Sequence, residues 1–121
     1  MFSFNSILLF SENPKALTKF YKSVLQTDPV WDEGDYSGFM LGEGMFIIGP
    51  HDKVHGKNQH PERLIVNFST DDVKGEYERI KKLKVKVIKE PYHPGEATEM
   101  MIATFADPDG NYFQFATPMK D

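Results

Sequence analysis

One order of apolar patterns occurs twice along the chain, and it constrains the fold more than any other feature. In each half, an alternating apolar stretch precedes an amphipathic helix pattern, and three short strand patterns follow. The first copy spans about residues 1–49 and the second about 62–121, and the Gly-, Pro- and polar-rich segment 50–61 is typical of a linker. The sequence therefore predicts an α+β fold in which 1–121 is a single domain of two tandem βαβββ modules.

The first module is expected to begin with a strand within residues 2–11 and to continue as a helix over 13–26. Asn13 can cap this helix, and Pro14 suits its first position. The apolar stripe of the helix consists of Ala16, Leu17, Phe20, Tyr21 and Val24. Three strands are predicted after it, at Val30–Asp32, Ser37–Leu41 and Met45–Gly49.

The second module repeats the pattern, with a strand over 63–70 and a helix over 71–83. Asp71 or Asp72 caps the helix. Its apolar stripe is Val73, Tyr77, Ile80 and Leu83. A strand over 85–91 and a hairpin of strands 98–106 and 111–117 follow, with Pro108 at the first turn position and Gly110 in the left-handed one.

Composition excludes several classes of function. The 121 residues contain no cysteine, so the chain has no disulfide framework, thiolate nucleophile or cysteine zinc site. The net charge is −4, and the basic stretch 79–90 has the spacing of a solvated helix and strand face, so we expect no nucleic-acid partner. No apolar run reaches the roughly 20 residues that span a bilayer, and the N-terminus lacks signal-peptide features. We therefore expect no membrane partner and a cytoplasmic location.

The sequences NPKALTKFYKSVL after the first strand and FADPDGNYFQF near the end resemble the vicinal oxygen chelate superfamily. This group includes glyoxalase I, bleomycin and fosfomycin resistance proteins, and extradiol dioxygenases. The resemblance covers essentially the whole chain. It implies paired βαβββ modules whose mixed sheet curls around a cup-shaped cavity, usually completed in a homodimer. The glycines that the family usually has at the two helix ends are replaced by Gln26 and Lys84.

In the metal-using members, the resemblance implies His, Glu or Gln ligands from the first and fourth strands of each module. Carried onto this sequence, the four positions are Ser6, Ile48, Ile65 and Gln114. Isoleucine donates nothing, a serine hydroxyl is a weak ligand, and Asn67 nearby would add only a neutral amide oxygen. We therefore expect no metal ion and no other cofactor.

The four histidines fall in segments without apolar periodicity. His51, His55 and His60 lie in the linker, and His93 lies in the loop YHPGEA. The spacing of His51 and His55 would suit a metal only on a helix, which Pro50 and the glycine at 56 disfavour. We expect exposed loop histidines, and no residue is assigned a catalytic role.

Residues expected to face the cavity are apolar with a few amides, as is common in pockets for small molecules. The predicted ligand-binding residues are Ser6, Leu8, Trp31, Phe46, Ile48, Ile65, Asn67, Tyr112 and Gln114. The alternative for the apolar ones is that they simply fill the core.

The leading functional hypothesis is a metal-free homodimer that binds a small organic molecule in an apolar cup. One alternative is a metal-dependent lyase or dioxygenase of the same superfamily, which would require stoichiometric metal. Another is a non-catalytic interaction or regulatory module whose protein partner fills the cup. Whether the chain is an enzyme stays open at this point, because one scaffold hosts unrelated chemistries.

Overall fold

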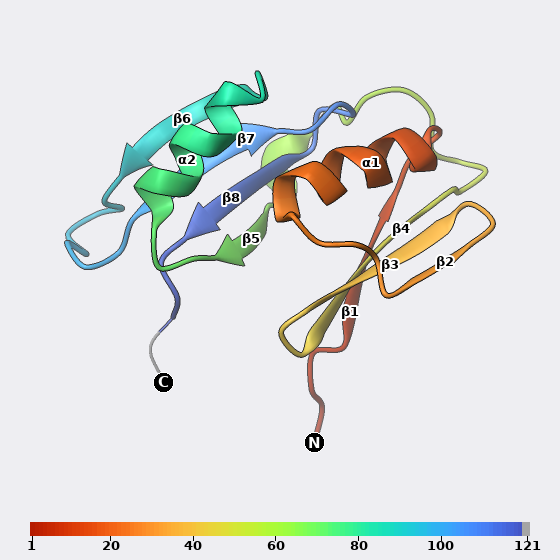
Figure 1. Ribbon diagram of the computed structural model, residues 1–121, viewed down its shortest axis with the longest axis horizontal. Helices are drawn as coiled ribbons and strands as arrows, with labels where there is room; N and C mark the ends of the chain where they lie inside the picture. The colour runs from red at the N-terminus through yellow and green to blue at the C-terminus, as the bar shows by residue number, and fades with distance from the viewer. Residues whose placement is uncertain (120–121) are drawn as a thin grey trace. The chain divides into compact units, whose positions relative to one another are not determined.

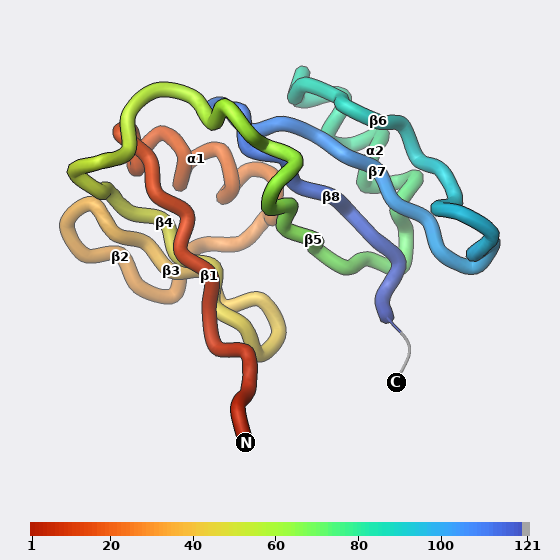
Figure 2. The backbone as a smooth tube through the Cα atoms, turned by 180° about the vertical axis from the view of Figure 1, so that it is seen from behind, coloured from red at the N-terminus to blue at the C-terminus, as the bar shows by residue number. Residues whose placement is uncertain are grey.

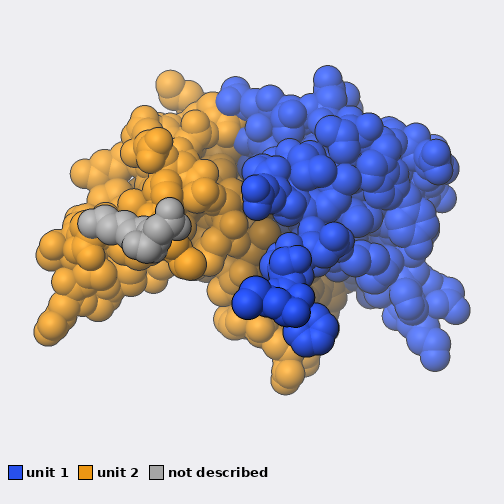
Figure 3. Space-filling model, turned by 90° about the horizontal axis from the view of Figure 1, so that it is seen from below, with its two compact units in different colours: residues 1–56 blue, residues 57–121 orange. Residues whose placement is uncertain are grey.

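The computed structural model describes residues 1–119. The chain divides into two compact units, Met1–Gly56 and Lys57–Asp121, which we call module one and module two (Figure 3). The division falls inside the segment 50–61 that the sequence indicates as a linker. Each module is described by itself below.

Module one is a four-stranded mixed sheet with one helix on one face (Figure 1). The strand order is β1-β4-β3-β2; β1 runs parallel to β4, whereas the other two pairs are antiparallel (Figure 2). Its elements are β1 (Ser6–Phe10), α1 (Pro14–Leu25), β2 (Trp31–Glu33), β3 (Tyr36–Leu41) and β4 (Gly44–Gly49).

Module two repeats this arrangement with the strand order β5-β8-β7-β6. A short 3-10 turn (Pro61–Arg63) precedes β5 (Val66–Ser69), α2 (Val73–Lys82), β6 (Lys86–Tyr92), β7 (Ile102–Ala106) and β8 (Tyr112–Ala116). Again the first strand pairs in parallel with the last, and the other pairs are antiparallel. The predicted α+β fold of two tandem βαβββ modules is confirmed.

Aromatic residues join each helix to its sheet. In module one, the ring centroids of Tyr21 on α1 and Phe46 on β4 are 4.9 Å apart. In module two, Tyr77 on α2 lies 5.9 Å from Phe105 on β7. The other core side chains include Leu17, Val24, Phe39 and Ile48 in module one and Val73, Ile80, Phe113 and Phe115 in module two. Burying these large side chains is the main source of stability in both modules.

The helix starts agree only partly with the sequence prediction. Pro14 occupies the first turn of α1, and Asp72 caps α2 by accepting a 3.0 Å hydrogen bond from the Gly75 amide. Asn13 stands at the N-cap position of α1, but its side chain makes no capping hydrogen bond; instead its backbone amide donates to Ser11 Oγ at 2.9 Å. The cap of α1 therefore differs from the expected one.

Both helices end with a non-glycine residue in the left-handed conformation. Gln26 has a φ of 53° and Lys84 has a φ of 64°. The Gln26 amide donates to the Lys22 carbonyl at 3.0 Å, and the Lys84 amide donates to the Lys81 carbonyl at 3.0 Å. These two residues thus perform the helix termination for which glycine is the least strained choice.

The turn between β7 and β8 is organised by Asp107, which is 5% exposed. Its carboxylate accepts hydrogen bonds from the amides of Asp109 at 2.9 Å and Asn111 at 3.0 Å, and from the Asn111 side chain. Gly110 has a φ of 82°, as the sequence predicts. The turn fixes how β7 and β8 pair and hence which residues of β8 share a face.

Some predicted boundaries and stripe positions are wrong. The first strand is shorter than residues 2–11, and Pro61–Arg63 forms a 3-10 turn where a strand was expected to begin. Ala16 is exposed and Leu83 is 49% exposed, so neither belongs to a core. Among the described residues, neither helix has the length and apolar character needed to cross a membrane.

Candidate functional site on the helix-free sheet faces

The helix covers one face of each sheet, and we call the other the helix-free face. In module one, Phe46 points to α1, so the neighbouring positions on β4 point to the helix-free face. Strand register then aligns one residue from each strand in a row across that face. The row consists of Leu8, Ile47, Gly38 and Trp31. It is apolar from edge to edge.

The Trp31 ring lies directly over Gly38. A Cβ atom added at Gly38 would stand 2.6 Å from the Trp31 Cε2 and Nε1 atoms, so no larger residue fits beneath the indole. Leu8, at the other end of the row, is 50% exposed. Module one therefore presents an indole ring and aliphatic side chains on this face, a surface suited to apolar or aromatic groups.

Phe46 and Ile48 lie on the opposite, helix-covered face of β4. Phe46 is 3% exposed and Ile48 is 0% exposed, and Phe46 also packs on Phe39 at 6.2 Å. Both were expected to face a cavity, but their alternation with Ile47 places them in the core under α1. The sequence interpretation was offset by one residue along β4, which exchanges the two faces.

Module two presents a polar row at the same positions of its sheet. Register aligns Asn67, Gln114, Thr104 and Lys89 across the four strands. The Gln114 amide nitrogen donates to the Thr104 hydroxyl oxygen at 2.9 Å. Thr104 is buried, Gln114 is half-buried and Asn67 is exposed. The hydrogen bond holds the Gln114 side chain along the sheet, with its carbonyl oxygen as the remaining acceptor.

The other predicted residues fall around these rows. Ser6 is on β1 two residues before Leu8, on the same face, and is aligned with Met45. Tyr112 is on β8 two residues before Gln114 and is aligned with Ala106. Ile65 precedes β5 and has no register partner. The structure thus brings Asn67 and Gln114 side by side, and it separates Phe46 and Ile48 from the rest.

Sequence reasoning missed four members of the rows: Ile47, Gly38, Thr104 and Lys89. The sequence could have identified Thr104, because it is the one hydrogen-bonding side chain within the apolar strand IATFA. It could not have identified Ile47, since all its neighbours on β4 are apolar or glycine. Lys89 lies beyond a register shift in β6 that no simple count of residues locates.

The donor atoms of these rows do not suit a catalytic divalent cation. Ile47 and Gln114 are equivalent, since each follows a buried Phe that opposes a Phe on the neighbouring strand. Leu8 and Asn67 are equivalent in the same way, through their register with these two residues. Leu8 and Ile47 carry no donor, and Asn67 and Gln114 carry only neutral amide groups. Within residues 1–119, no three His, Cys, Asp or Glu side chains gather as a metal site would require.

All four histidines are exposed and lie in loops, as predicted. His51 contacts the Phe10 ring at 5.1 Å and pairs with Asp52 at 3.2 Å. The His93 Nδ1 atom is hydrogen bonded to the Met100 carbonyl oxygen at 2.6 Å. The contact of His51 with Phe10 places the start of the linker against β1, and the other two contacts lie within loop segments.

Three solved structures show how similar this fold is to known ones. A lactoylglutathione lyase from Agrobacterium tumefaciens is 16% identical, with 95% of this chain and 92% of that chain covered and a TM-score of 0.75. A glyoxalase/bleomycin resistance protein from Catenulispora acidiphila is 17% identical, with 97% and 100% covered and a TM-score of 0.71. The fosfomycin resistance protein FosX from Listeria monocytogenes is 17% identical, with 98% and 93% covered and a TM-score of 0.67. At these identities the similarity shows the fold.

No curated protein sequence matches the chain. The family model described as Glyoxalase/Bleomycin resistance protein/Dioxygenase superfamily does match, over residues 3–115. That range includes nearly all of both modules and every residue of the two rows. The chain therefore belongs to the Glyoxalase/Bleomycin resistance protein/Dioxygenase superfamily.

Proposed function

We propose that the protein binds a small organic molecule on the helix-free faces of its sheets and that no metal ion takes part. The observation that carries this proposal is the hydrogen bond from Gln114 to Thr104, in register with Asn67. It orients the Gln114 amide in module two, and the exposed amide of Asn67 lies beside it in register. Orienting amides next to an aromatic side chain such as Tyr112 are the usual elements of a small-molecule site.

The chemistry of the rows defines the ligand class. The Gln114 carbonyl oxygen and the Asn67 amide can accept from and donate to a neutral polar group such as an amide or a hydroxyl. Lys89 at the edge of the row adds one positive charge. Module one separately offers Trp31, Ile47 and Leu8 to an apolar or aromatic group. A neutral or singly anionic compound with an amide or hydroxyl group satisfies the row of module two, and an aromatic or aliphatic group satisfies the row of module one.

The test is a screen of aromatic amides, phenols and short peptides by thermal shift, followed by ¹H–¹⁵N NMR titration of the hits. Gln114→Ala should weaken binding about tenfold or more, since a buried polar ligand group loses its partner. Thr104→Val should weaken it less, because the valine keeps the shape but releases the Gln114 side chain. Gln59→Ala is the matched control: this glutamine lies in the linker and bonds only to the Lys57 carbonyl at 3.2 Å.

If no compound of these classes stabilises the protein, or if Gln114→Ala and Gln59→Ala bind equally well, the proposal is wrong. A specific protein that co-purifies while small molecules fail to bind would favour an interaction module. We also propose a homodimer, supported by the exposure of Leu8 at 50% and Met40 at 48% on module one. Light scattering over a concentration series tests this, and a monomer at every concentration would overturn it.

The alternative is a metal-dependent lyase or dioxygenase. The description of one structural neighbour as a lactoylglutathione lyase favours it. The donor chemistry of Leu8, Ile47, Asn67 and Gln114 opposes it. Metal content distinguishes the two proposed functions. A lyase of this kind requires about one metal ion per chain, and Gln114→Ala should lower the number of ions bound.

A further inference from the structure

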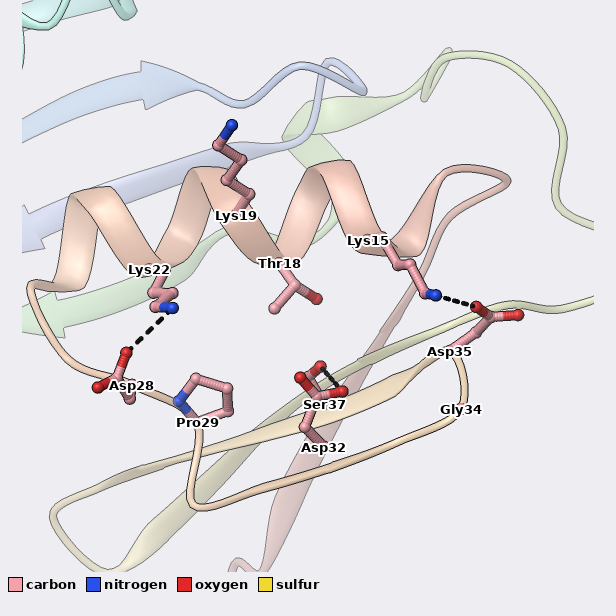
Figure 4. Close-up of a pocket in the computed structure, with 10 residues that line it drawn as sticks. All are labelled: Lys15, Thr18, Lys19, Lys22, Asp28, Pro29, Asp32, Gly34, Asp35 and Ser37. Atoms are coloured by element: carbon pink, nitrogen blue, oxygen red, sulfur yellow. Dashed lines mark hydrogen bonds and ion pairs between the residues drawn. The ribbon is translucent and has the colours of Figure 1, made fainter.

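Module one contains an open pocket of about 830 Å³ that is separate from the helix-free face. It lies between α1 and the β2–β3 hairpin, on the side of the sheet that the helix covers (Figure 4). The lining residues are Lys15, Thr18, Lys19, Lys22, Asp28, Pro29, Asp32, Gly34, Asp35 and Ser37. All of them belong to residues 15–37, so this pocket is built by module one alone.

An ion pair lies at each end of the pocket. Lys22 Nζ lies 3.1 Å from Asp28 Oδ1, and Lys15 Nζ lies 3.9 Å from Asp35 Oδ1. The third lysine that α1 contributes, Lys19, points away from the hairpin in Figure 4. The lysines that line the pocket are therefore either paired at its ends or directed elsewhere, and an anion would find no free cation at the centre.

The centre of the pocket presents oxygen atoms. Ser37 Oγ donates a 3.3 Å hydrogen bond to Asp32 Oδ1, and Figure 4 shows Thr18 pointing from α1 toward these two residues. Thr18 is 9% exposed, and its hydroxyl oxygen has no hydrogen-bond partner. A buried hydroxyl without a partner is unfavourable, and polar groups of this kind are rarely left unsatisfied in proteins. Something that binds here would meet one carboxylate and two hydroxyl groups.

We propose that this pocket binds the primary ammonium group of a small organic amine. A protonated amine has three N–H donors and no acceptor, which matches the oxygen atoms of Asp32, Thr18 and Ser37. The Asp32 carboxylate supplies the opposite charge, and the ring of Pro29 gives the ligand's carbon chain an apolar contact. This site is independent of the proposed function, because it uses the other face of the sheet and none of the row residues.

The test is a ¹H–¹⁵N NMR titration of the full chain at fixed ionic strength with n-butylamine, n-butanol and tetramethylammonium. Only n-butylamine should produce saturable shifts at residues 15–37, because n-butanol lacks the charge and tetramethylammonium lacks N–H donors. Asp32→Asn should weaken binding about tenfold or more, since it removes the charge and keeps the shape. Asp28→Asn is the matched control, because that carboxylate is paired with Lys22, and it should change affinity less than about twofold.

Thr18→Val tests whether the threonine hydroxyl contributes to ligand binding without contributing to stability. Valine has the same shape, and the threonine hydroxyl makes no hydrogen bond, so the variant should melt no lower than the parent while it binds n-butylamine several-fold more weakly. Gln114→Ala should leave amine binding unchanged, so failure of the proposed function and failure of this site are distinguishable. Equal shifts with tetramethylammonium, shifts that do not saturate, or an Asp32→Asn variant that binds like the parent would each overturn the proposal.

Discussion

The two modules have the same element order and the same covered face, but their helix-free faces differ. On the covered side, Phe39 opposes Phe46 in module one, and Phe105 opposes Phe113 in module two. On the other side, apolar Ile47 stands where Gln114 stands. The comparison teaches that the central strand positions packed against the helix hold large aromatic residues in both modules, whereas the corresponding positions on the other face differ in chemistry.

The two rows differ in the donor atoms that they carry. At the equivalent positions on the first and last strands, module two has amide oxygens and module one has none. Module one has leucine and isoleucine there, and the Trp31 ring lies over Gly38 in the same row. Neither the apolar row of module one nor the neutral amides of module two supply the charged donors that a divalent cation prefers.

The largest expected effect on the free energy of unfolding comes from a substitution on the helix-covered face of a sheet. Phe46→Ala should destabilise the protein by about 3–5 kcal/mol, because the ring is buried between Tyr21 and Phe39. Leu8→Ala, on the helix-free face at 50% exposure, should cost about 1 kcal/mol or less. Urea unfolding of both variants measures the difference. Equal costs for the two substitutions would mean that the faces of β1 and β4 have been assigned incorrectly.

A medium effect is expected at the turn between β7 and β8, which Asp107 organises. Asp107→Ala removes the acceptor for the amides of Asp109 and Asn111 and should cost about 1–3 kcal/mol. Asp109→Ala is the control, since its side chain makes none of those bonds, and it should have little effect. Thermal and urea unfolding report both. A neutral Asp107→Ala would show that β7 and β8 pair without this cap.

The smallest effect concerns a feature that the modules share. Gln26→Gly and Lys84→Gly should each stabilise the protein by about 0.5–1 kcal/mol, because both residues hold a positive φ that glycine adopts without strain. Glu78→Gly, at an exposed position inside α2, should instead destabilise by about 1 kcal/mol. The sign of the change in urea midpoint decides the matter. Destabilisation at 26 or 84 would contradict the left-handed assignment.

The sequence predicted module two better than module one for a physical reason. In NYFQFAT, Phe113 and Phe115 alternate with Gln114, so polarity alone separates the two faces. In GMFIIG, every residue from Met45 to Ile48 is apolar, and alternation carries no signal. Only the contact between Phe46 and the helix reveals the face, and that contact is tertiary.

Other features were out of reach of the sequence for similar reasons. The pocket beside α1 is lined by lysines at the spacing of an ordinary solvated helix and by aspartates of the following loop and hairpin, so nothing in their sequence pattern distinguishes it. Thr18 becomes notable only when its burial and its missing partner are known. Turn chemistry, by contrast, is local, and the positive φ of Gly110 followed directly from DPDGN.

The most direct test of the central claim is the metal content of the untagged protein purified without chelator, measured together with its melting temperature in EDTA and in added Mn, Fe, Ni or Zn. We predict far less than one metal ion per chain and the same melting temperature under all conditions, because the oxygen donors of the rows are two neutral amides and one threonine hydroxyl. About one ion per chain, lost in Gln114→Ala, with a lower melting temperature in EDTA, would contradict the account and indicate metal-dependent chemistry.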